Sequence, residues 1–101
     1  MAIVAVSIAP LGTETASVSK YVAAAEKVLR EDGRLRYRLD PMFTTIEGDL
    51  SVIFEVIQKM QEAVFAEGAV RVSTVIKIDE RRDKEARMED KVRKVEALLE
   101  E

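Results

Sequence analysis

The chain has 101 residues, of which 48% are hydrophobic, with 16 basic and 19 acidic side chains. It contains no cysteine and no histidine, which excludes disulfides, thiolate nucleophiles, imidazole bases and the usual zinc sites. A net charge of −3 argues against nucleic acid or anionic lipid as a partner. The length predicts a single domain over residues 1–101 with its own hydrophobic core.

The composition also bears on the environment of the protein. Asparagine is absent, glutamine occurs only at Gln58 and Gln61, and nearly all polar side chains are charged, a composition that leans thermophilic. The apolar run from Ala2 to Pro10 is too short to span a bilayer and has no basic leader or cleavage site. We therefore expect it to be a strand of a cytoplasmic protein.

The first part of the chain predicts a strand, a helix and a second strand. Residues 3–9 are rich in β-branched side chains and end at a turn of sequence Pro10-Leu11-Gly12. Ser17 is predicted to cap a helix that Gly33 ends. Residues 35–39 alternate apolar and basic side chains, as an edge strand does. The predicted helix has one apolar stripe, formed by Val18, Val22, Ala25 and Leu29.

The second part of the chain predicts a strand, a helix, another strand and a last helix. Residues 42–47 follow Pro41 as a strand, and Asp49 is predicted to cap a helix that Gly68 ends. Residues 70–79 alternate strictly and predict a long strand. The expected second helix is apolar at Leu50, Ile53, Phe54, Ile57, Met60 and Val64. A narrow stripe that suits docking on a subunit or partner then follows at Met88, Val92, Val95 and Leu99.

This order predicts an α+β fold, a ferredoxin-like βαββαβ sandwich with an additional C-terminal helix. We expect the first and third strands to lie side by side and parallel, the fourth strand to flank the first, and both main helices to cover one face. The other face is then bare. Because Ile3, Phe43 and Val75 are expected on it, we also expect another subunit to cover it.

Side-chain alternation predicts a small-ligand site on that bare face. Glu47 is the hypothetical orienting carboxylate, and Lys77 a fixed positive charge. Ser7, Thr45 and Ser73 would supply neutral hydroxyl groups, above a floor of small side chains from the first strand. The alternative is that Glu47 and Lys77 form a salt bridge between subunits.

The charged and aromatic residues also allow functions other than small-ligand binding. Arg81 and Arg82 could hold an anion, but solvated loop charges explain them more simply. An enzyme without histidine would need Glu47, an aspartate, Lys77 or a tyrosine as acid or base, and no pair of carboxylates has a spacing that indicates catalysis. An RNA-binding domain of this topology would stack bases on aromatic residues, and the central strands offer only Phe43. A structural or regulatory oligomerisation module without a ligand stays open.

Several short blocks, taken together and in order, resemble a known family. These blocks are Pro10-Leu11-Gly12, Ser17-Val18-Ser19-Lys20-Tyr21-Val22-Ala23, Pro41-Met42, Thr45-Ile46-Glu47-Gly48 and Lys77-Ile78-Asp79-Glu80-Arg81-Arg82-Asp83. The resemblance is to the thiamine-binding protein family, formerly catalogued as the uncharacterised family DUF77 (UPF0045). It covers nearly the whole chain.

The resemblance implies a ferredoxin-like subunit that assembles through its sheets into dimers and then tetramers. It further implies binding of thiamine or its hydroxymethylpyrimidine moiety, with no reaction catalysed and no cofactor. An aminopyrimidine could engage Glu47 and nearby hydroxyls, and the thiazolium cation of thiamine would favour a carboxylate or the ring of Phe43. The sequence departs from the family's usual pattern at Asp40 and Phe43, where glycine is common, and a bulky Phe43 would narrow the pocket.

Overall fold

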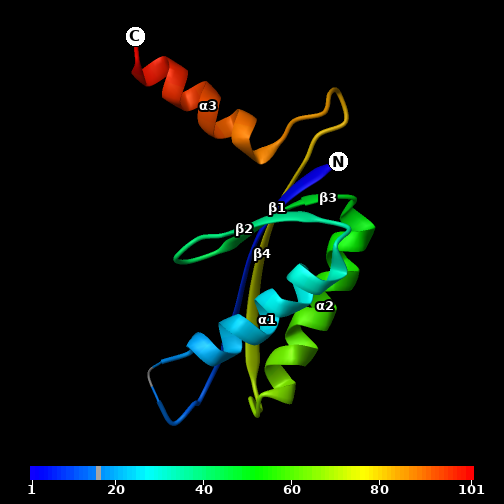
Figure 1. Cartoon of the computed structure of the whole chain (residues 1–101), viewed down its shortest axis with the longest axis vertical. Helices are drawn as coiled ribbons and strands as arrows, with labels where there is room; N and C mark the ends of the chain where they lie inside the picture. Colours follow the sequence, from blue (N-terminus) through cyan, green and yellow to red (C-terminus); the bar gives the residue numbers. More distant parts are fainter. Residues whose placement is uncertain (16) are drawn as a thin grey trace.

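The computed structural model describes residues 1–15 and 17–101 and confirms the ferredoxin-like sandwich with an added helix. The four strands form one sheet, and two helices cover one of its faces while the third lies at the far end of the molecule (Figure 1). Along the chain the elements are β1 (Ala2–Pro10), α1 (Ser19–Asp32), β2 (Arg36–Leu39), β3 (Thr44–Gly48), α2 (Leu50–Ala66), β4 (Val72–Glu80) and α3 (Met88–Leu99).

The sheet has the order β2-β3-β1-β4, so β2 is an edge strand and β4 flanks β1, as expected. The expectation that β1 and β3 run parallel was wrong, because they pair antiparallel. The reason is topological: the helical crossover makes β1 and β2 parallel, and the tight turn after β2 then reverses the chain and inserts β3 between them. Every pair of neighbouring strands is therefore antiparallel.

The core lies between the sheet and the helices α1 and α2. Val4 and Ile46 face each other across β1 and β3 and are fully buried, which confirms the predicted alternation of these two strands. Helix α2 contributes most to this core, through Ile53, Val56, Ile57, Met60 and Val64. No helix in residues 1–15 and 17–101 is both long enough and apolar enough to cross a membrane.

The two core helices begin differently. Asp49 caps α2 as predicted, since its carboxylate accepts hydrogen bonds from the backbone N–H groups of Ser51 at 2.9 Å and Val52 at 3.3 Å. The prediction that Ser17 caps the first helix was wrong. Helix α1 begins two residues later at Ser19, and Val18 occupies the cap position without a side-chain hydrogen bond. Gly33, with φ of +77°, ends this helix as expected.

Helix α3 contacts the rest of the molecule mainly through its first residues. Met88 is buried, whereas the aliphatic side chains further along α3 are exposed, from 43% for Val92 to 78% for Leu99. In Figure 1 the helix extends away from the sheet and from α1 and α2. The predicted narrow stripe is thus present, and most of it has no partner among the described residues of this chain.

Candidate functional site

Five of the six residues predicted to form the site lie on the sheet face opposite α1 and α2. Thr45 and Lys77 flank Ala5 on either side, while Glu47 is opposite Ile3. Ser7 is on the same face two residues beyond Ala5, and Ser73 pairs with Ala9 at the end of the row. Lys77 and Ser73 are exposed, whereas Ser7 and Thr45 are half-buried. The strand register thus brings these polar groups onto one surface, as the sequence predicts.

Glu47 is buried on this face because α3 begins directly above it. Its carboxylate pairs with Arg36 and accepts a hydrogen bond of 2.8 Å from the backbone N–H of Met88, and the Arg87 guanidinium lies 3.7 Å away. Arg36 also bonds Glu89 at the start of α3. These contacts within one chain were not predicted, because they depend on the register of β2 and β3 and on where α3 folds back. The pairing of Glu47 with Lys77 between subunits stays a prediction.

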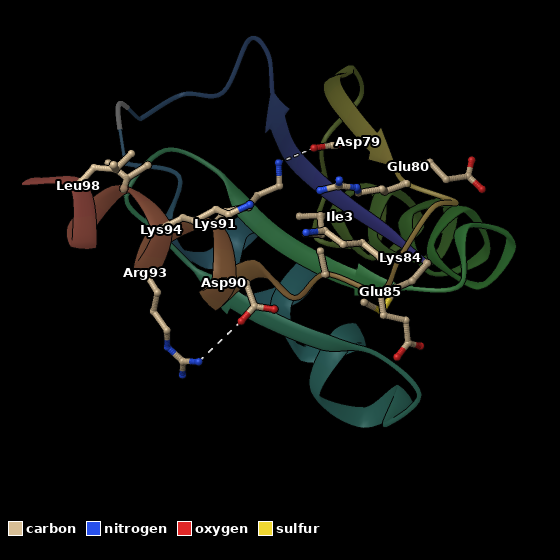
Figure 2. Close-up of a pocket in the computed structure, with 14 residues that line it drawn as sticks. Ile3, Asp79, Glu80, Lys84, Glu85, Asp90, Lys91, Arg93, Lys94 and Leu98 are labelled. Carbon is tan, nitrogen blue, oxygen red and sulfur yellow. Dashed lines mark hydrogen bonds and ion pairs between the residues drawn. The ribbon is translucent and has the colours of Figure 1, made fainter.

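A broad hollow of about 1080 Å³ lies between α3 and the adjacent end of the sheet. Met1 and Ile3 contribute apolar surface to it, and charged side chains of β4, α3 and the loop between them surround it (Figure 2). The ion pair between Lys91 and Asp79 joins α3 to β4 there, and it holds the pKa of Asp79 below its ordinary value. The hollow is thus charged at its rim.

Arg81 and Arg82 at the start of this loop are each engaged by a carboxylate two residues away. Arg81 bonds Asp83 at 2.6 Å, and this contact lowers the pKa of Asp83 to about 2. Arg82 lies 3.4 Å from a carboxylate oxygen of Glu80. Both arginine side chains are exposed, so these pairs add little to stability.

A second, narrower cleft of about 440 Å³ opens at the other end of the sheet, where β1 extends beyond β3. Strand β3 pairs with β1 only up to Val6, whereas β4 pairs along all nine residues of β1. The cleft occupies the space between the unpaired side of β1, helix α1 and the turn from β2 to β3. Ser7 is part of its β1 wall.

Phe43, the sixth predicted site residue, lies just before β3 and lines this cleft. It was expected on the bare face in line with Thr45 and Glu47. Strand β3 begins only at Thr44, so the alternation of side chains does not extend back to Phe43. The Asp40 N–H donates to the Phe43 carbonyl at 3.0 Å and closes the turn that holds the ring half-buried beside the cleft.

Two carboxylates line this cleft: Asp40, which pairs with Arg38, and Glu26, which sequence reasoning missed. Glu26 belongs to α1, and its carboxylate accepts a hydrogen bond of 2.7 Å from the hydroxyl of Thr44. Partial burial raises the pKa of the Glu26 carboxyl above its ordinary value, and the Thr44 bond offsets part of that rise. The sequence signal was slight: Glu26 directly follows Ala25 of the apolar stripe and lies one helical turn after Val22.

Comparison with known proteins identifies relatives over nearly the whole chain. A model of the family described as thiamine-binding protein matches residues 4–96. The UPF0045 protein YqgV of Bacillus subtilis is 50% identical, and the match covers 98% of both chains. A UPF0045 protein of Methanothermobacter thermautotrophicus is 39% identical over 92% of this chain and 94% of the relative.

Solved structures agree with these sequence matches. The crystal structure of the hypothetical protein MJ1052 from Methanocaldococcus jannaschii superposes with a TM-score of 0.85 at 38% identity, covering 94% of this chain and 95% of the other. A Thermotoga maritima protein described as a candidate for thiamine biosynthesis or salvage has a TM-score of 0.78 at 21% identity, covering 93% and 97%. The second likeness supports the shared fold alone.

Proposed function

This chain belongs to the thiamine-binding protein family, and we propose that it binds thiamine or its hydroxymethylpyrimidine moiety without catalysing a reaction. The match of the family model to residues 4–96 carries this proposal, because it includes most of β1, all of the other strands and both core helices. The cleft at the end of the sheet supports it, since its volume of about 440 Å³ falls in the range of small-molecule sites.

We place the proposed ligand site at the end of the sheet, where Ser7 and Phe43 line the cleft. Three further predicted residues, Thr45, Ser73 and Lys77, provide polar groups on the adjoining open face. Glu47, the sixth, already has three partners within the chain, so a ligand that used it would first have to displace one of them.

We also propose that copies of the chain cover the open face and the exposed stripe of α3, giving a tetramer built from two dimers. Val75 on that face is 54% exposed, and Val95 on α3 is 57% exposed, which is costly for a surface left in water. Light scattering of the purified protein is expected to give four times the mass of one chain. Val95→Lys is expected to lower that mass, with Lys94→Glu as a control on the same helix. A wild-type monomer would contradict the assembly.

Titration calorimetry with thiamine and with hydroxymethylpyrimidine tests the binding function directly. We expect saturable binding of one or both ligands at one site per chain, with no chemical change in the recovered ligand. The thiazole half of thiamine alone serves as the control for which ring is recognised. If neither thiamine nor hydroxymethylpyrimidine binds, the chain is better explained as a structural oligomerisation module, which its exposed α3 stripe also favours.

A further inference from the structure

We infer that the cleft between α1 and the β2–β3 turn holds the aminopyrimidine ring of the ligand, and that the carboxyl group of Glu26 binds the amino edge of that ring. This inference rests on the proposed function and assigns the recognition of the ligand to Glu26 in place of Glu47. It also places the ring on the helix side of the sheet, at the open end of the core.

The walls of the cleft suit a flat ring with one polar edge. Apolar side chains come from both sides, with Val6 and Met60 from the core and Val22 from α1. The Phe43 ring closes the side formed by the turn. Polar side chains on the helix side are few: Glu26 and Thr44 line the cleft there, and Asp40, which is paired with Arg38, lines it at the turn. Such a site gains affinity from burial of the ring and orientation from its few hydrogen bonds.

Glu26 has unused capacity to bind a ligand. One carboxylate oxygen, Oε1, accepts the hydrogen bond from Thr44, and among residues 1–15 and 17–101 no other hydrogen bond or ion pair reaches this carboxylate. A half-buried carboxylate without a cation is unfavourable, and the raised pKa of Glu26 has this cause. A ligand amine donating to the free oxygen would compensate for the lost hydration.

A further hollow of about 680 Å³, separate from the broad one beside α3, adjoins the cleft along the same stretch of α1. Val22, Glu26 and Leu39 line both hollows, so Glu26 stands where they meet. The rest of a ligand molecule, beyond its pyrimidine ring, therefore has space beside Glu26 while the ring stays in the cleft. Glu47 lacks such space, because Met88 and Arg87 of the α3 start cover its carboxylate.

Titration of the full chain with hydroxymethylpyrimidine, with matched glutamate variants, tests this assignment. Glu26→Gln is expected to weaken binding by at least about tenfold, since it removes a charge-assisted hydrogen bond. Glu47→Gln and Glu31→Gln are expected to bind within about twofold of wild type, Glu31 being an exposed glutamate of the same helix that pairs with Lys27. An analogue of the pyrimidine that lacks the amine should bind wild type and Glu26→Gln equally weakly.

A second variant guards against a folding defect in Glu26→Gln. Val22→Phe fills the cleft and leaves Glu26 in place, and it is also expected to abolish binding while the thermal unfolding midpoint stays near that of wild type. If wild type binds and both variants still bind normally, the assignment to the cleft is wrong although the proposed function stands; loss of binding in Glu47→Gln would then locate the ligand on the open face. If wild type binds neither thiamine nor the pyrimidine, both proposals fail.

Discussion

Replacing Glu47 with alanine is expected to release the start of α3 from the sheet and to lower the free energy of unfolding by about 2 kcal/mol. The carboxylate is 3% exposed and holds together β3, β2 and α3 through Arg36 and the backbone of Met88. Removing one partner of a buried ion pair leaves the other charge poorly solvated. The expected loss of stability is smaller than for a fully buried ion pair, because water still reaches half of the Arg36 side chain.

Urea denaturation measures the stability change, and hydrogen exchange of the α3 amides measures the release. Glu47→Gln should lose less stability, because the amide oxygen can still accept from the Met88 N–H. Glu55→Ala removes an exposed partner of Arg34 and should behave like wild type in both measurements. Unchanged protection of the α3 amides in Glu47→Ala would show that this carboxylate does not anchor the helix.

Gly48→Ala is expected to lower the free energy of unfolding by about 3 kcal/mol, the sum of backbone strain and a steric clash. Gly48 has a φ of +153°, a conformation that residues with a Cβ rarely adopt. A Cβ there would lie 2.6 Å from Cδ2 of Leu35, whose side chain is buried in the core. The side chain of Leu35 would have to shift to make room for the added methyl group.

Two comparisons separate strain from clash in urea denaturation. Gly33→Ala, at a φ of +77° with open space around it, should cost about 1 kcal/mol through strain alone. In a Leu35→Ala background the additional cost of Gly48→Ala should shrink, because the clashing atoms are gone. Equal costs of Gly48→Ala in both backgrounds would show that Leu35 adjusts freely and that the clash contributes nothing.

The elements that the sequence predicted well are those with a strong local signal. Strand β1 is rich in β-branched side chains. Asp49 is a strong helix cap, and Gly33 ends α1. The two-residue period also placed Thr45 and Glu47 on the face away from the helices. These features depend on neighbours close in sequence, so one sequence suffices to predict them.

The parts that were missed depend on contacts between distant elements. Phe54 belongs to the periodic stripe of α2 yet is 46% exposed, whereas Val56 is fully buried, because the packing of α1 and the sheet decides which side of the stripe is covered. The contact between Arg36 and Glu47 needs the strand register, and the cleft at Glu26 needs the early end of the β1–β3 pairing. Periodicity contains none of this information.

The long pairing of β1 with β4 has a consequence for synthesis on the ribosome. It joins residues 2–10 to residues 72–80, so β1 leaves the exit tunnel about 60 residues before the strand that pairs along its whole length. Until then one side of an apolar nine-residue strand stays unpaired in the nascent polypeptide. Residues 2–10 are therefore a segment of the nascent chain that benefits from shielding by chaperones until β4 is available.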